Sequence, residues 1–277
     1  RGQPGGCVPS PNRQGSSLMT DWTAPTPRRE ALAVWYRNIL VWKKMAIGSA
    51  LTQFGEPFIY LLGLGYGLGM FIGEMAEIPY LAFLASGFVA FSATNTATFE
   101  GMWSVYTRMV PQQTYEAILA TPTRVDDIVL GELLWCSTKG LFSGTAILVV
   151  ATILGAVESW TAIFALPILF LTGFCFAAPA LIMTAVARGY EFFTYYYTLV
   201  ITPMFILSGV FYPTTALPEV MQSVVSFLPL THAVAIIRPL VIGQPISDFW
   251  FHFSYLCVFG AVGMYVAVAM VRRRLII

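Results

Sequence analysis

The stretch LSGVFYPTTALPEV, residues Leu207–Val220, interrupts a chain that is otherwise strongly apolar. It follows the apolar run YYYTLVITPMFI and contains Gly209, Pro213 and Pro218, each of which disfavours a straight helix. Across the chain 57% of the residues are hydrophobic and only 10% are charged, whereas about a quarter of the residues in a soluble domain are charged. We therefore expect an all-α integral membrane protein, in which this stretch is the turn where one span ends and the chain folds back.

The composition also limits the partners. A net charge of +1 argues against a nucleic-acid binder, which would concentrate basic residues on one face. The cysteines lie far apart, three of them in apolar runs, so we predict neither a CxxC metal site nor a disulfide framework; they are Cys7, Cys136, Cys175 and Cys257. Membrane lipid is the partner that the composition implies, and we expect no metal or cofactor on this chain.

The apolar segments predict six transmembrane helices of roughly 20 or more residues each. Residues 1–18 are rich in Gly, Pro and Ser and precede MTDW at Met19, so we interpret them as a disordered leader or a remnant of expression, and 19–277 as one membrane domain. Basic and aromatic residues are mixed at helical spacing in 28–45, which predicts a helix in the membrane interface or, alternatively, a solvated helix packed on the protein. The expected spans are 51–72, 79–105, 128–154, 160–187, 192–211 and 249–271.

The charges between the spans predict the orientation. Six spans place both termini on one side of the membrane, and most of the basic residues fall on that same side: Arg28, Arg29, Arg37, Lys43, Lys44, Arg108, Arg124, Arg188, Arg272, Arg273 and Arg274. On the opposite side, Arg238 is the only Lys or Arg outside the expected spans. Because basic loops stay in the cytoplasm, we expect both termini to be cytoplasmic, in a multi-pass protein of a bacterial inner membrane.

The link between the second and third spans predicts a short separate helix. The sequence QQTYEAILA lies between Pro111 and Pro122, and good helix formers bounded by prolines indicate a helix that starts near Gln113 or Thr114. Its mixture of apolar and charged residues, which we expect to be exposed, is typical of a helix that docks into a groove on another protein. The alternative is an interfacial turn lying against the membrane.

The external segment after the fifth span contains two short apolar pieces, VMQSVVSFLPL and HAVAIIRPLVIG, which we expect to end at Pro229, Pro239 and Gly243. Each piece is too short to cross a hydrocarbon core of about 30 Å. Re-entrant or interfacial helices are the usual structure for such lengths. We therefore expect re-entrant helices between the fifth and sixth spans.

Polar and aromatic residues within the spans are the candidates for a substrate route, because charged side chains in a membrane are costly. Glu100 and Trp103 stand in a polar segment of the second span. Lys139 lies two turns after Glu132 and has three possible partners: Glu132, Glu100 or an anionic substrate. In the fifth span Tyr195, Tyr196 and Tyr197 belong to either an interfacial aromatic belt or a sugar-binding surface.

The order of these parts resembles the type-2 permeases of ATP-binding-cassette exporters, and most closely the NodJ-like branch that exports nodulation lipo-chitooligosaccharides. The resemblance covers Met19 to Ile277 and rests on QQTYEAILATPTRVDDIVLGEL and SGVFYPTTALPEVMQSVVSFLPLTHAVAIIRPLVIG. It implies a homodimer joined to two cytoplasmic ATPase subunits, which use ATP and Mg. It implies ATPase-coupling contacts at Gln113, Tyr115, Glu116, Ala117, Ile118, Leu119, Arg124, Asp126, Arg29 and Arg37. It also implies an external gate, which includes Gly209, Phe211, Pro213, Pro218 and Pro229.

The chain itself is not expected to be an enzyme. It has no G-x-x-x-x-G-K-[ST] phosphate-binding loop, so ATP hydrolysis would come from a partner. The leading expectation is a permease that moves a lipid-linked or lipid-modified oligosaccharide outward, and the first alternative is an exporter of a hydrophobic drug or lipid. A membrane lipid or sugar transferase would need a catalytic cluster, for which His232, His252 and Asp248 are the candidates. An ion-coupled transporter would show internal repeats with paired broken helices, and no such repeat is evident.

Overall fold

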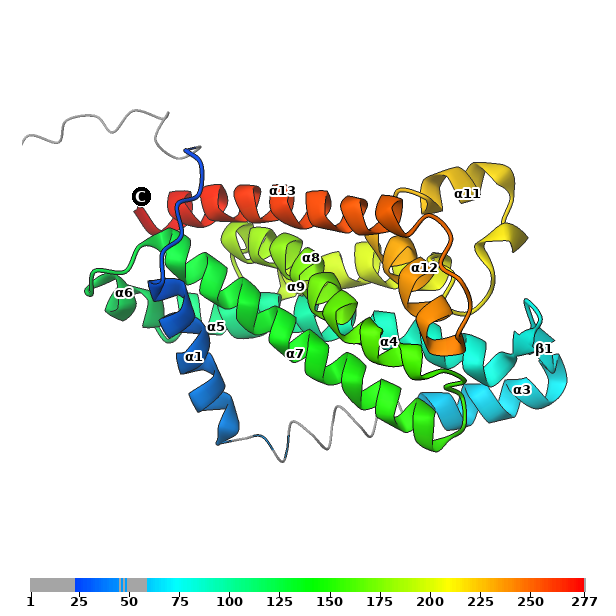
Figure 1. Cartoon of the computed structure of the whole chain (residues 1–277). Coiled ribbons are helices and arrows are strands. Elements are labelled where there is room, and N and C mark those ends of the chain that lie inside the picture. Colours follow the sequence, from blue (N-terminus) through cyan, green and yellow to red (C-terminus); the bar gives the residue numbers. More distant parts are fainter. Residues whose placement is uncertain (1–22, 45, 47, 49–58, 277) are drawn as a thin grey trace, which may run out of the picture.

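The computed structural model describes residues 23–44, 46, 48 and 59–276. The expected leader 1–18 and the first part of the expected span 51–72, up to residue 58, lie outside the described residues. Long helices run side by side along one axis, with α6 (Thr114–Leu119) and the C-terminus at one end and α3 (Gly67–Ile72) and α11 (Glu219–Val225) at the other (Figure 1). We call these the α6 end and the α11 end.

Among the described residues, four helices are long and apolar enough to cross a membrane: Tyr80–Met109, Val125–Ile153, Trp160–Val186 and Phe249–Leu275. The first joins α4 (Tyr80–Phe99), the π-helical turn η2 (Glu100–Ser104) and α5 (Val105–Met109). The second is α7 (Val125–Ile153), the third combines η3 (Trp160–Phe164) with α8 (Ala165–Val186), and the fourth lies in α13 (Phe249–Ile276). The chain is thus a helical protein with several membrane spans.

The two other expected spans are shorter or more broken. In the described part of 51–72, η1 (Leu61–Tyr66) and α3 form one apolar helix that is shorter than the four helices above. A two-residue hairpin, β1 (Glu74–Met75) and β2 (Ile78–Pro79), then leads into α4. The expected span 192–211 consists of α9 (Glu191–Tyr196), η4 (Tyr197–Ile201) and α10 (Thr202–Leu207), and the helix ends before Gly209.

Small residues let the central helices approach closely. α7 packs against both α4 and α8. A Cβ atom on Gly140 of α7 would lie 2.8 Å from the carbonyl oxygen of Ala93 on α4, a distance that leaves no room for a side chain. Within about one turn of the glycine contact, the hydroxyls of Ser92 and Ser143 share a hydrogen bond of 2.5 Å. Without a hydrophobic driving force between helices in lipid, such close backbone contact and hydrogen bonding stabilise the pairing.

The N-terminal segment and α1 (Glu30–Lys43) pack against the start of α7. The carboxylates of Asp126 and Asp127 accept hydrogen bonds from the backbone N–H groups of Thr26 (2.9 Å) and Arg28 (2.5 Å). Ala31, Val34 and Asn38 of α1 are buried against the bundle, whereas Leu32 and Tyr36 are 55% exposed. The helix therefore has one packed face and one apolar outward face.

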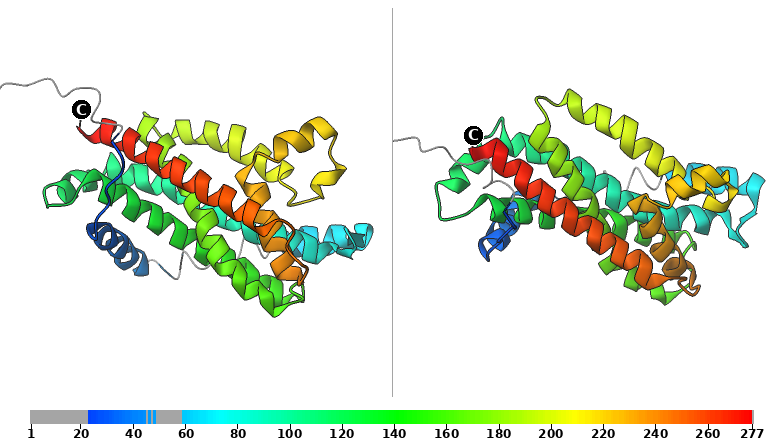
Figure 2. Two further views of the ribbon diagram at one scale, coloured as in Figure 1. Left: turned by 45° about the horizontal axis from the view of Figure 1, so that its top comes forward. Right: turned by 90° about the horizontal axis from the view of Figure 1, so that it is seen from above.

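The segment between α10 and α13 departs from the expected helix ends. η5 (Thr214–Ala216) and α11 precede α12 (Pro229–Ile242), and α11 and α12 meet at 88°. Pro229 does not end an apolar piece but begins α12, because a proline in the first helical turn needs no N–H partner. Pro239 also does not end the helix; it lies inside α12, which continues to Gly243, where φ is +85°. Figure 1 and Figure 2 show α12 at an angle to α13, near the α11 end.

Candidate functional site

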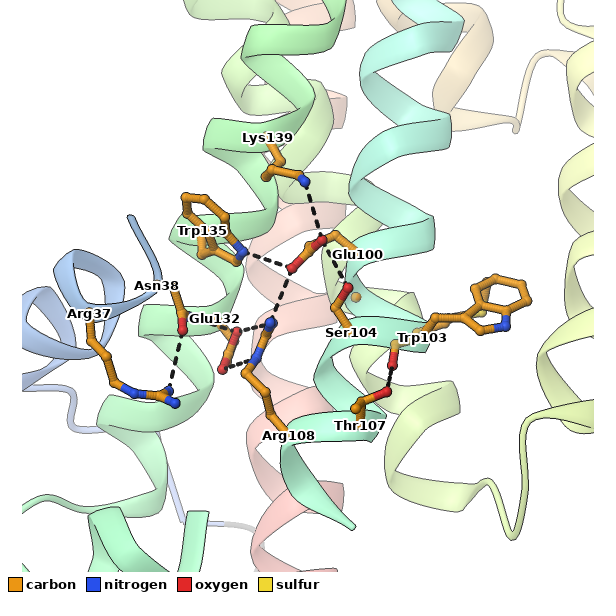
Figure 3. A network of polar contacts seen from close by, with 12 residues as sticks. Arg37, Asn38, Glu100, Trp103, Ser104, Thr107, Arg108, Glu132, Trp135 and Lys139 are labelled. Carbon is orange, nitrogen blue, oxygen red and sulfur yellow. Dashed lines mark hydrogen bonds and ion pairs between the residues drawn. The ribbon is translucent and has the colours of Figure 1, made fainter. Parts of the chain in front are cut away.

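Four charged side chains come together where η2 lies beside α7, and we call Glu100, Arg108, Glu132 and Lys139 the four-charge cluster (Figure 3). On α7, residues 132, 135 and 139 are spaced by three and four, so Glu132, Trp135 and Lys139 share one helix face. Glu100 opens the π-helical turn that continues α4, and Arg108 stands eight residues later in α5. π-Helical turns inside α-helices occur frequently at functional sites.

Arg108 is the centre of this cluster. Its guanidinium forms a bidentate contact with Glu132, with Nε 3.1 Å from Oε1 and Nη2 2.8 Å from Oε2. The third nitrogen, Nη1, lies 3.2 Å from Oε1 of Glu100. Glu132 is fully buried, so its charge depends on this planar fork, which matches a carboxylate better than a lysine would.

Neutral groups complete the coordination of both carboxylates. Glu100 accepts hydrogen bonds from the Trp135 indole at 2.8 Å and from the Ser104 hydroxyl at 3.0 Å. Glu132 accepts one from the Asn38 amide of α1 at 3.0 Å. The cluster therefore joins three segments that are far apart in the sequence, and α1 is part of it.

Lys139 is the least coordinated member. Its Nζ lies 3.6 Å from Oε2 of Glu100 and 5.9 Å from the centre of the Trp135 ring. Within the described part of the chain, the structure gives its ammonium group no hydrogen bond. The sequence left open whether Lys139 pairs with Glu132 or Glu100; it contacts Glu100, while Glu132 is held by Arg108.

A pocket of about 880 Å³ lies beside this cluster. Its wall combines charged groups with aromatic rings, including Arg37, Arg108, Lys139, Trp42, Trp103 and Trp135. Trp42 stacks on Phe142 of α7 with 5.3 Å between ring centres. The pocket can thus offer hydrogen-bond donors, the ammonium group of Lys139 and flat apolar surfaces to one ligand.

Among the other expected route residues, Trp103 lines two pockets, whereas the three tyrosines of the expected fifth span do not line the large one. Trp103 points away from the four-charge cluster, as Figure 3 shows, and its ring packs on Phe193 of α9 at 5.4 Å. The Tyr197 hydroxyl donates to Oδ1 of Asn95 at 2.6 Å, and both residues line a smaller pocket of about 320 Å³ with Trp103. Tyr196 is partly buried, whereas Tyr195 is 64% exposed and points outward. The three tyrosines therefore do not form one surface.

The residues expected to contact an ATPase divide into exposed and buried ones. Exposed residues near the α6 end are Arg29, Gln113, Glu116, Ala117 and Arg124. Ile118 and Leu119 are half-buried against the bundle, and Arg37 lines the large pocket, where it donates to Asn38.

Tyr115 and Asp126 are not exposed, contrary to the sequence-based expectation. Tyr115 is 1% exposed in an apolar cluster, and burial raises the pKa of its phenol well above the ordinary value. Asp126 is bound by Arg272 of α13, with Nη2 2.5 Å from Oδ2. The ring of Tyr115 packs α6 onto the bundle, and Asp126 joins α7 to α13, so neither side chain is exposed for contact with a partner.

The expected gate residues lie at the α11 end. Gly209 adopts φ of +80° in the turn that follows α10, and the ring of Phe211 lies 4.8 Å from that of Phe205. Pro213 precedes η5, Pro218 precedes α11 and Pro229 begins α12. Each proline therefore stands at the start of one helix in the segment between α10 and α13.

Sequence reasoning did not include Arg108, Trp135, Asn38 or Trp42 among the site residues. The eight-residue spacing between Glu100 and Arg108 was a usable signal for a shared helix face, although the π-helical turn changes the register. For Asn38 and Trp42 no signal exists in the sequence, because their contacts join α1 to a helix about one hundred residues away.

The candidate transferase residues also approach one another. Nδ1 of His232 lies 2.7 Å from Nδ1 of His252, and Nε2 of His232 lies 2.9 Å from the Ser226 carbonyl oxygen. In the part of the chain that the structure describes, no group of three His, Cys, Asp or Glu residues is placed to hold a metal ion. The pair is a hydrogen-bonded contact between α12 and α13.

Comparison with known proteins adds independent information. Residues 29–242 match the family model of the ABC-2 type transporter. The chain is 47% identical to nodulation protein J of Rhizobium meliloti (strain 1021) over 244 residues, which are 88% of this chain and 93% of that protein. It is 44% identical to nodulation protein J of Rhizobium leguminosarum bv. viciae over 91% of this chain and 98% of that protein. It is also 23% identical to the inner membrane transport permease YadH of Escherichia coli (strain K12) over 72% of this chain and 76% of that protein.

Proposed function

Because the chain belongs to the ABC-2 type transporter family, as a permease of the nodulation protein J type, we propose that it forms the membrane route of an ATP-driven exporter. Its cargo is a lipid-modified oligosaccharide, which moves outward from the cytoplasmic side. The chain performs no chemistry on the cargo. In this proposal it has six spans with both termini in the cytoplasm, in agreement with the distribution of its basic residues.

The observation that carries the proposal is the large pocket beside the four-charge cluster. Ligand sites are typically concave, mostly apolar and provided with a few placed polar groups. Here Lys139 supplies donors, and Trp42, Trp103 and Trp135 supply flat rings, within about 880 Å³. The hydroxyl groups of a sugar need donors and acceptors, while its apolar faces pack on aromatic rings. A pocket with both kinds of surface suits the head group of an amphiphile.

Energy comes from a separate ATPase subunit, which uses ATP and Mg. In our proposal two such subunits bind a homodimer of this chain. The contact with each one is formed by Gln113, which precedes α6, and by the exposed Glu116 and Ala117 of α6, beside Arg29 and Arg124. The buried ring of Tyr115 anchors α6 to the bundle. When ATP brings the ATPase subunits together, the force on α6 reaches α7 through this anchored helix and changes the packing along the route.

Two lysines allow a matched test of the cargo pocket. Lys139 lines the pocket, whereas Lys43 is exposed at the end of α1. We expect an N-acylated oligosaccharide to stimulate ATP hydrolysis by the permease reconstituted with its ATPase subunit. Lys139→Met should raise the cargo concentration for half-maximal stimulation about tenfold, which corresponds to about 1.4 kcal/mol of binding free energy, and Lys43→Met should not.

Two outcomes would overturn this assignment. If Lys139→Met responds to the cargo as the wild type does, the pocket is not the head-group site. If the free fatty acid stimulates hydrolysis as strongly as the acylated sugar, the exporter takes an undecorated lipid instead.

A further inference from the structure

A second cation lies half-buried at the α11 end, away from the pocket. Arg238 of α12 directs its guanidinium toward α4 and the turn after α10. Its Nε donates to the Ser86 hydroxyl at 3.1 Å, and Nη2 donates to the carbonyl oxygens of Phe83 at 3.3 Å and Gly209 at 2.7 Å. The guanidinium carbon also lies 3.7 Å from the centre of the Phe83 ring. One side chain thus joins three separate segments.

In the described part of the chain, no carboxylate forms an ion pair with Arg238. A buried charge is costly unless it is paired and hydrogen-bonded, so its stability depends on carbonyl dipoles, a hydroxyl and the face of an aromatic ring. The shortest of these contacts is to Gly209, which belongs to the turn and not to a long helix. Displacing the turn would leave a donor of the half-buried Arg238 without this partner, at an energetic cost.

The turn fits closely on α4. A Cβ atom at Gly87 would lie 2.9 Å from the Cα and carbonyl oxygen of Val210, so the two backbones are in direct contact. Gly209 has φ of +80°, a conformation that residues with a side chain rarely adopt, and its carbonyl oxygen accepts the hydrogen bond from Arg238. Phe211 then packs on Phe88 of α4, with 5.8 Å between ring centres.

We propose that Arg238 is a positioning residue that holds the turn 207–212 closed on α4 and so keeps the α11 end of the route shut in the absence of cargo. The inference rests on the proposed export function. During export the turn moves away from α4 and its bond to Arg238 breaks. The unsatisfied guanidinium then favours return to the closed arrangement. ATP is therefore not hydrolysed to open the α11 end when no cargo is present.

Arg274 provides a matched control at the opposite end. Like Arg238 it donates to backbone carbonyls, through Nη1 to those of Thr184, Ala185 and Ala187 at 2.7, 3.0 and 2.6 Å. Each arginine therefore fastens a different segment, the turn 207–212 for Arg238 and the C-terminal end of α8 for Arg274. Replacement by methionine keeps the length of both side chains and removes their donors.

Hydrogen–deuterium exchange of the full permease–ATPase complex, without cargo, tests the closure directly. We expect Arg238→Met to speed exchange in 207–213 at least tenfold and to leave 184–189 unchanged, and Arg274→Met to do the reverse. In the same complexes, Arg238→Met should raise the number of ATP molecules hydrolysed per cargo exported several-fold. A side chain that only stabilised the fold would not change this ratio.

Milder variants keep the test decisive if Arg238→Met does not fold. Arg238→Lys keeps the charge but reaches fewer acceptors, and Ser86→Ala removes one acceptor, so both should give intermediate exchange in 207–213. Unchanged exchange in these variants, or faster exchange with an unchanged ATP ratio, would overturn the inference. If the wild type exports no acylated sugar while the exchange contrast holds, the proposed cargo is wrong and the closure by Arg238 stands.

Discussion

The four-charge cluster and the Arg238 site both stabilise positively charged side chains within the bundle, but they do so with different kinds of partner. At the α6 half of the bundle, Arg108 and Lys139 are neutralised by two carboxylates, Glu100 and Glu132. At the α11 end, Arg238 is surrounded by carbonyl oxygens, a hydroxyl and a ring. The first arrangement joins side chains of long helices, and the second joins a side chain to the backbone of a turn.

This difference predicts that substitutions at the two sites destabilise the protein to different extents. Removing one partner from a buried set of paired charges leaves a charge without compensation, so the whole fold suffers. Removing a cation from neutral carbonyls leaves only unpaired dipoles, so the effect stays close to the turn. We therefore infer that the four-charge cluster serves assembly of the bundle and the pocket wall, whereas the Arg238 site serves a movement.

The largest effect is expected for Arg108→Met. The variant would remove the guanidinium from the fully buried carboxylate of Glu132, which would keep the hydrogen bond from the Asn38 amide. We expect a loss of about 3–5 kcal/mol in the free energy of unfolding. The measurement is unfolding in mixed detergent micelles, with the exposed Arg188→Met as the control.

Neutralising the carboxylates sharpens this test. If charge imbalance is the cause, Arg108→Met combined with Glu100→Gln and Glu132→Gln should regain part of the lost stability. Equal stability of Arg108→Met and Arg188→Met would show that the four-charge cluster does not support the fold.

A smaller effect is expected for Gly209→Ala at the α11 end. The residue has φ of +80°, and an added Cβ would lie 3.0 Å from the Thr214 side chain. An L-residue in the left-handed region costs about 1–2 kcal/mol, which we expect to appear in the same unfolding measurement. Gly189→Ala is the matched control, since Gly189 has open space and no positive φ. Indistinguishable stabilities of the two variants would mean that the turn tolerates a side chain.

The smallest effect is expected for Ser104→Ala. Its hydroxyl donates to Glu100 at 3.0 Å, but Glu100 keeps Arg108 and Trp135 as partners. We expect a loss of about 1 kcal/mol, and none for the exposed Ser223→Ala of α11. A loss as large as that of Arg108→Met would contradict the central role of the guanidinium in the four-charge cluster.

The sequence predicted the general architecture because its signals are local. Proline on both sides of QQTYEAILA was sufficient for the short helix that the structure has at Thr114–Leu119. Gly209 and Pro213 likewise indicated the end of the helix that stops at Leu207. The family follows from similar order and composition of these parts, and the matches to nodulation protein J confirm it.

Burial and partnership could not be predicted in the same way. Tyr115 looked like a surface residue of a docking helix, but its ring is buried because α6 turns that side toward the bundle. Asp126 looked available, yet α13, which ends 150 residues later, brings Arg272 onto it. Lys139 had two candidate carboxylates, and the choice depended on how η2 is positioned against α7.

By itself, then, the sequence determined that this chain crosses a membrane, where α6 and α10 end and which transporter family it belongs to, because hydropathy, proline, glycine and the order of the parts can be read along the chain. Only the tertiary structure decided which charges meet. Arg238 was a lone basic residue on the side opposite most others in the sequence, and it became the link between α4, α12 and the turn at Gly209. The physical reason is that a buried charge takes its partners from whichever segments the fold brings within hydrogen-bond distance, and that distance is not encoded in spacing along the chain.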